Sequence, residues 1–132
     1  MKIAIIFDRV HIADLAVQRL LDAVFILPPP SEIHIPATGD TASRIATWAA
    51  GHNYPIISHR SLHDAKEVRL LGQWVTELPP VQHRERFKQM VRMTDYSLIL
   101  SPRTSYLRGD ADLHRLQDYV RGQGKRYVVL QA

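Results

Sequence analysis

The sequence predicts an α/β fold in which a mainly parallel sheet of about five strands is covered by helices on both faces. Two observations support this prediction. Short apolar segments alternate with segments of helical periodicity, which implies right-handed βαβ crossovers. The first apolar segment, residues 2–7, is continuous, as in strands that are buried on both faces. A chain of 132 residues is the usual size of one domain, so we expect a single domain over residues 1–132.

The first quarter of the chain predicts a strand, a helix and a stiff connector. The strand is the segment at residues 2–7. Residues 11–24 carry apolar side chains at helical spacing and predict a helix. Residues 25–31 contain three consecutive prolines, which cannot continue a helix, and they predict an extended connector.

Residues 32–58 predict a strand, a tight turn, a helix and a second strand. Ile33 and Ile35 alternate with polar residues, and Pro36 should end the first strand because proline cannot donate to a sheet. The turn falls at residues 38–41. Apolar residues then recur at helical spacing until about residue 51, and we expect one of three polar residues to cap this helix. The three cap candidates are Asp40, Thr41 and Ser43.

The second half of the chain continues the alternation. Residues 59–78 are less regular and predict a loop with a helical piece over residues 65–75. The later expected elements are a helix at 81–93, a strand at 96–100, a loop at 101–110, a helix at 112–122 and a strand at 127–131.

Composition excludes several protein classes. The chain is 45% hydrophobic and 23% charged, and no apolar run approaches the ~18 residues of a membrane span. It lacks cysteine and shows no secretory signal pattern, so we expect a cytoplasmic protein with no membrane partner. The net charge is +4, with 13 arginines among 17 basic residues. This excess is compatible with a nucleic-acid partner, but no nucleic-acid motif accompanies it.

The most informative stretch is the turn before the central helix. In parallel sheets, ligands gather beyond the carboxyl ends of the strands. A helix that starts there presents N–H groups and a positive dipole end, which favour an anion. Arg9 follows the first strand, and its planar fork suits phosphate. The candidate ligand-binding residues are Arg9, Thr38, Gly39, Asp40, Thr41, Ser101 and Arg103.

Each candidate also has a purely structural interpretation. Gly39 could serve only to allow a turn with positive φ, Thr41 could serve only as a cap, and Arg9 could be a solvated side chain. If the protein is an enzyme, Asp8 and Asp40 are the candidate general acid and base. His59 and His63 have helical i, i+4 spacing, but a third ligand is not identified, so we expect no metal and no cofactor.

Four short motifs follow one another along the chain in an order that is familiar from a protein family. They are residues 6–9 (Ile-Phe-Asp-Arg), 48–57 (Trp-Ala with a later Tyr-Pro-Ile-Ile), 86–91 (Arg-Phe-Lys-Gln-Met-Val) and 95–98 (Asp-Tyr-Ser-Leu). This order resembles the SLOG superfamily of Rossmann-like domains, in particular its small YpsA- and YspA-related group. LOG phosphoribohydrolases and DNA-processing protein A are more distant members. The glycine pair of that group falls on Pro36 and Ala37, and the phosphoribohydrolase signature is missing from residues 101–112.

The resemblance therefore implies a Rossmann-like scaffold, an arginine at Arg9 and a homodimer, as is common in the group. Together with the turn, it favours binding of a nucleotide or a phosphorylated nucleoside derivative. One alternative is hydrolysis of the N-glycosidic bond of nucleoside monophosphates. Another is a non-enzymatic module that binds nucleic acid or protein.

Overall fold

A single all-parallel sheet forms the centre of the molecule. The computed structural model describes residues 1–7, 21–22, 29–62, 67–70, 72–101 and 108–131. Within these ranges six strands pair in the order β4-β3-β2-β1-β5-β6. The strands are β1 (Lys2–Ile6), β2 (Glu32–Pro36), β3 (Ile56–His59), β4 (Val75–Glu77), β5 (Tyr96–Ser101) and β6 (Arg126–Gln131). The helices with defined bounds are α2 (Gly39–Gly51), α3 (His83–Met93) and α4 (Arg108–Gly122).

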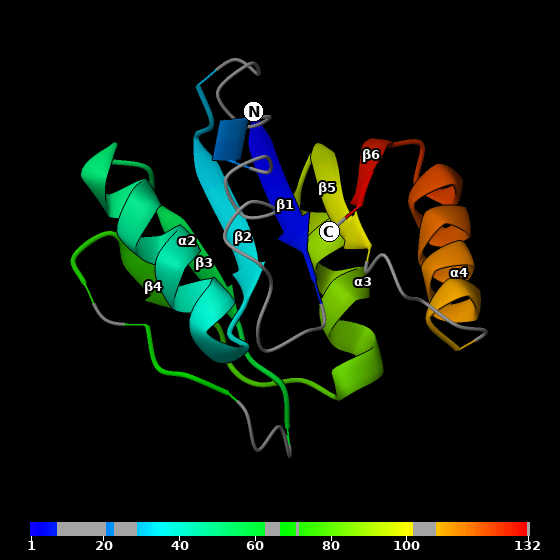
Figure 1. Cartoon of the computed structure of the whole chain (residues 1–132), viewed down its shortest axis with the longest axis horizontal. Helices are drawn as coiled ribbons and strands as arrows, with labels where there is room; N and C mark the ends of the chain where they lie inside the picture. The colour runs from blue at the N-terminus through cyan, green and yellow to red at the C-terminus, as the bar shows by residue number, and fades with distance from the viewer. Residues whose placement is uncertain (8–20, 23–28, 63–66, 71, 102–107, 132) are drawn as a thin grey trace.

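Helices cover both faces of the sheet, so the predicted three-layer Rossmann-like α/β fold is confirmed. Alternate residues of each strand point to opposite faces. Ile3 and Ile33 pack with Ile45 of α2, whereas Ala4 packs with Met90 of α3. Figure 1 shows α2 in front of the sheet and α3 behind it. The described helices are all too short or too polar to cross a bilayer.

Helix ends are closed by specific contacts. At the end of α2, the amides of His52 and Tyr54 donate to the carbonyl of Ala49 at 3.1 and 2.9 Å. At the end of α3, Lys125 Nζ donates to the carbonyls of Val91 and Arg92 at 2.7 and 2.8 Å. The last carbonyls of a helix lack intrahelical partners, so these contacts stabilise both termini.

The structure corrects the prediction for residues 65–75. The described part of this range is not helical, and Val75 begins β4, a sixth strand that the sequence did not predict. Gly72 has φ 149, which interrupts a helix, and Val75 pairs with Ile56 of β3. Residues 75–77 are therefore extended because they pair with β3, and this pairing cannot be predicted from the local sequence pattern.

Most other boundaries are confirmed to within a few residues, with two corrections. α4 begins at Arg108, four residues before the predicted start, so residues 108–110 belong to a helix and not to a loop. The helix predicted at 11–24 lies outside the described residues except for Leu21 and Asp22, which are helical. Most of the connector predicted at 25–31 also lies outside them.

Candidate functional site

The ends of β2 and β3 and the first turns of α2 and α3 meet at one edge of the sheet, which we call the carboxyl edge. Parallel strands end at the same edge, and both helices begin there because α2 follows β2 and α3 follows β4. In Figure 1 the arrowheads of β1 and β2 point toward the lower part of the view, where α2 starts. The positive ends of two helix dipoles therefore face this edge.

The turn from β2 into α2 is made by Thr38 and Gly39. Gly39 has φ 64, a conformation that other residues rarely adopt. α2 starts at Gly39, so Thr38 is its N-cap, and no side-chain hydrogen bond from Thr38 caps the helix. The predicted caps Asp40, Thr41 and Ser43 are wrong, because all three lie inside the helix.

The turn residues differ in exposure. Thr38, Gly39 and Thr41 are buried, whereas the Asp40 side chain is 54% exposed. Asp40 lies 3.7 Å from Arg44, one turn further along α2. Its carboxylate therefore faces outward along the helix, while the rest of the turn is enclosed.

A buried arginine supports the turn from the opposite face. Arg86, in the first turn of α3, is fully buried, and its Nη1 donates to Thr38 Oγ1 at 3.0 Å. Its guanidinium carbon lies 5.1 Å from the centre of the Phe87 ring. Burial of a charge is costly unless polar groups compensate it, so arginines are rarely enclosed in this way. Arg86 thus places a full positive charge beneath the start of α2.

Two buried histidines lie beside this arginine. His34 Nδ1 is 2.7 Å from His59 Nε2, and both side chains are fully buried. His34 Nε2 is 2.9 Å from Glu32 Oε2, and His59 Nδ1 is 3.4 Å from Gln89 Oε1. The four side chains therefore form a continuous chain of polar contacts across β2, β3 and α3.

Burial keeps both imidazoles neutral at neutral pH. Burial lowers the pKa of His34, although the hydrogen bond to Glu32 opposes this change. Burial, together with the nearby His34 and Arg86, lowers the pKa of His59 to about 3, although the hydrogen bond to Gln89 opposes this change. A neutral imidazole can donate one hydrogen bond and accept one.

The sequence contained a partial signal for this cluster. His34 lies between Ile33 and Ile35, so strand alternation places it on the face opposite to these isoleucines. The register then aligns Pro36 with His59, which brings His59 to the same face. His59 is the last residue of β3, so it does not lie on a helix as the i, i+4 spacing with His63 would require. His63 lies outside the described residues. Within the part of the chain that the structure describes, no three His, Cys, Asp or Glu side chains cluster as potential metal ligands.

The structure brings together only some of the candidate ligand residues. Thr38, Gly39 and Thr41 form the turn, and Arg86, which the sequence matched only to a family motif, joins them. Ser101 ends β5, two strands from β2, or roughly 10 Å at the usual strand spacing. Asp8, Arg9 and Arg103 lie outside the described residues.

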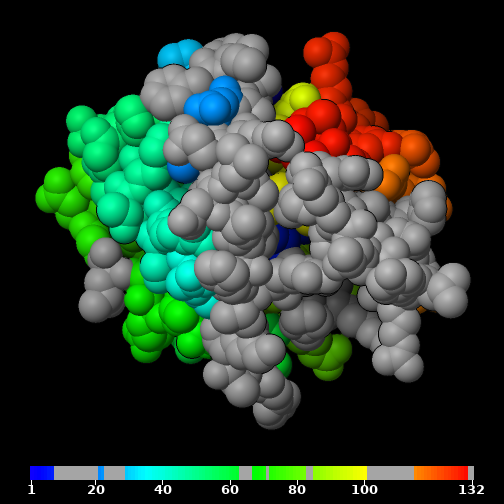
Figure 2. Space-filling model, viewed as in Figure 1, coloured from blue at the N-terminus to red at the C-terminus, as the bar shows by residue number. Residues whose placement is uncertain are grey.

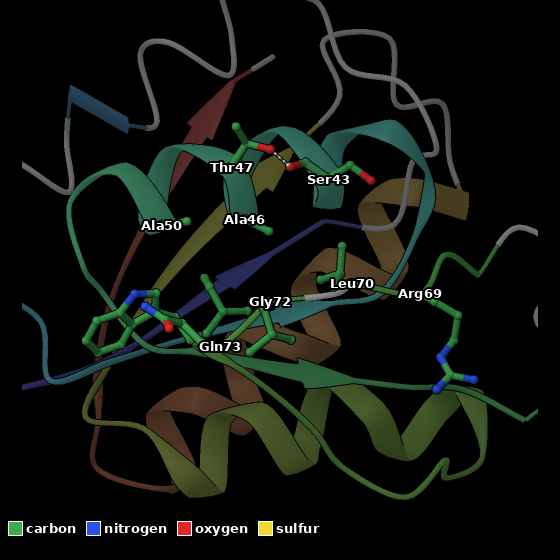
Figure 3. A pocket seen from close by; sticks show the side chains of 11 residues that line it. Ser43, Ala46, Thr47, Ala50, Arg69, Leu70, Gly72 and Gln73 are labelled. Carbon is green, nitrogen blue, oxygen red and sulfur yellow. Dashed lines mark hydrogen bonds between the residues drawn. The ribbon is translucent and has the colours of Figure 1, made fainter.

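A separate pocket of about 460 Å³ lies between α2 and the segment that leads into β4. Figure 3 shows Ala46 on α2 and Leu70 on that segment to either side of the pocket, and Figure 2 shows α2 at the surface on this side of the molecule. The charged side chain on its wall, Arg69, donates to Glu77 Oε1 at 3.0 Å. The pocket is thus mainly apolar and distinct from the carboxyl edge.

Comparison of the chain with protein families, with curated proteins and with solved structures gives no match. The resemblance to the SLOG superfamily therefore stays a prediction from sequence motifs.

Proposed function

We propose that this protein binds a phosphate-bearing small molecule, such as a nucleotide, at the carboxyl edge. The observation that carries the proposal is the buried guanidinium of Arg86, which donates to Thr38 at the start of α2. Arginine presents its donors in a planar fork that fits two phosphate oxygens.

Two further features support an anion at this position. The positive ends of α2 and α3 face the edge, and Gly39 lets the backbone turn closely. The proposed key arginine is thus Arg86, which adds to the sequence-based candidate Arg9.

The burial of Thr38, Gly39 and Thr41 constrains how a ligand enters. A phosphate reaches this turn only if the turn opens locally. We therefore expect association to be slower than at a preformed site, because a required conformational change lowers the association rate. Once enclosed, the phosphate is shielded from water, which strengthens its interaction with Arg86.

The proposal is limited to binding. Of the two candidate acid–base residues, Asp40 faces Arg44 on the outer side of α2, and Asp8 lies outside the described residues. Hydrolysis of an N-glycosidic bond stays an alternative that rests on the sequence, and no contact among the described residues of this edge favours it.

Calorimetry at low salt tests the proposal, with inorganic phosphate and nucleoside mono-, di- and triphosphates as probes. We expect binding of at least one probe and a loss of about 10- to 100-fold in Arg86→Gln, because a charge-assisted hydrogen bond contributes about 1.5–3 kcal/mol. Arg92→Gln is the matched control, since Arg92 lies in the last turn of the same helix with a half-exposed side chain.

Arg86→Lys and Thr38→Val serve if Arg86→Gln fails to fold. The lysine keeps the charge but lacks the fork, so we expect intermediate affinity. Absence of heat with every probe, or equal losses in the Arg86 and Arg92 variants, would contradict the proposal.

A further inference from the structure

The polar chain from Glu32 to Gln89 links solvent to the interior face of α3. Glu32 is 31% exposed at the amino end of β2, whereas His34 and His59 are fully buried behind it. The two rings lie with their centres 5.0 Å apart and their planes tilted by 40°. The chain then reaches Gln89, one turn after Arg86 on α3.

When both rings are neutral, the contacts among these four side chains determine which ring nitrogens carry a hydrogen. An ionised Glu32 only accepts, so His34 Nε2 must carry a hydrogen. His34 Nδ1 is then bare and must accept from His59 Nε2 across the gap of 2.7 Å. Neutral His59 consequently has a bare Nδ1, which needs the amide NH₂ group of Gln89 as its donor.

The opposite orientation of the Gln89 amide, in which the structure places it, fits a different proton count. Its Oε1 faces His59 Nδ1 at 3.4 Å, and an oxygen can only accept. This orientation requires a hydrogen on Nδ1 of His59. Neutral His59 then accepts at Nε2 from His34 Nδ1, and the pair of Glu32 and His34 holds one more proton than before. The two states thus differ by one proton and by rotation of the Gln89 amide.

We propose that Glu32, His34, His59 and Gln89 form a pH-sensitive switch in which uptake of one proton reverses both hydrogen bonds between His34 and Gln89. The hydrogen between the two rings passes from His59 Nε2 to His34 Nδ1. The added proton is carried on Nδ1 of His59, which then donates to Gln89 Oε1. His34 becomes an imidazolium beside the Glu32 carboxylate.

The charges around the chain determine which ring becomes charged. Glu32 favours a positive His34, and Lys2, 3.8 Å from Glu32, opposes it. On the α3 side, Arg86 opposes a positive His59. After β3, Arg60 is bonded to Glu67 at 3.3 Å, so these two charges offset each other. The positive ring is therefore His34, and because burial lowers its pKa, uptake occurs below pH 6.5.

The switch does not depend on anion binding, since it follows from the four side chains alone. Its output is the rotation of Gln89, on the helix that also carries Arg86. Binding of phosphate and reversal of the hydrogen bonds are measured separately, so either proposal can fail without the other.

Nitrogen-15 NMR of protein labelled at histidine tests the switch between pH 8 and pH 4.5, because ring ¹⁵N shifts distinguish bare from protonated nitrogens. We expect His59 to change from the Nε2–H to the Nδ1–H form at the same midpoint at which His34 becomes doubly protonated. Glu32→Gln should lower that midpoint by about one pH unit, because it removes the charge that stabilises the imidazolium. Glu85→Gln, an exposed carboxylate on α3, is the matched control and should not move it.

Gln89→Leu is a second test variant. It removes the Oε1 atom that accepts from His59 Nδ1 in the protonated state, so it should also lower the midpoint. The switch is contradicted if His59 keeps one tautomer while His34 titrates, or if Glu32→Gln and Glu85→Gln behave alike. Unfolding of the protein before any change of tautomer also contradicts it.

Discussion

The two faces of the sheet bury different kinds of side chain around β1, β2 and β3. The face toward α2 is apolar, with Ile5, Ile35 and Ile45 fully buried in one cluster. The face toward α3 buries a histidine pair and Arg86 beside its own apolar residues. Apolar packing depends on side chains of matching volume and shape, whereas buried polar groups also require hydrogen-bond partners of matched protonation. The α2 face therefore supplies stability, and the α3 face carries the polar groups on which our proposals rest.

The largest expected effect is on the apolar face. Ile35→Ala removes three buried carbon atoms where α2 and β2 meet, and we expect it to lower the free energy of unfolding by about 3 kcal/mol. Urea denaturation at pH 7 measures this change. A loss below about 1 kcal/mol would mean that this face can collapse around the cavity, which would weaken the contrast between the two faces.

The next effect is the pH dependence of the polar face. The pKa of His59 is about 3 in the folded protein and 6.5 in the unfolded chain, so the unfolded chain binds more protons between these values. The free energy of unfolding should therefore be constant above pH 6.5 and fall on acidification, by about 2–3 kcal/mol at pH 4.5 from His59 alone. Urea denaturation across this range measures the slope.

A variant with leucine at both His34 and His59 is the control for this slope. It lacks the two titrating groups, so the fall between pH 6.5 and pH 4.5 should be smaller by a similar amount. Equal slopes in the two proteins would show that the exposed carboxylates, and not the buried pair, dominate the response to acid.

The smallest effect is the coupling between the two histidines at pH 7. His59→Leu alone leaves His34 Nδ1 without its partner, which costs about 1–3 kcal/mol. Replacement of both rings removes that penalty, so the double variant should be more stable than the sum of the single changes by about 1 kcal/mol. A double-mutant cycle measures this term, and additive losses would show that the 2.7 Å contact contributes no coupling.

The sequence predicted the fold because the fold follows from local periodicity. The continuous apolar run of β1 and the helical spacing in α2, with Ala42, Ile45 and Ala49 buried, are readable without any tertiary knowledge. β4 was missed because it has three residues, and its pairing with β3 is what makes it a strand. The cap of α2 was misplaced because Gly39, with its positive φ, lets the helix start earlier than the polar residues suggested.

The candidate site was predicted in part, for a related reason. The turn at Thr38 and Gly39 is local and was found from its residue types. The burial of Arg86 depends on the crossover that carries α3 from β4 to β5 beneath β2, and the contact of His34 with His59 depends on the register between two strands. Neither relation is encoded in the residues next to them, so sequence reasoning could not assemble this part of the site.

The strand order also has a consequence for synthesis on the ribosome. β1 is made first, yet it lies between β2 and β5, and Lys2 is joined to Asp95 by hydrogen bonds in both directions. Its second neighbour becomes available only after residues 96–101 have been translated. Until then, an isoleucine-rich strand keeps one open edge, which exposes the nascent protein to misassociation.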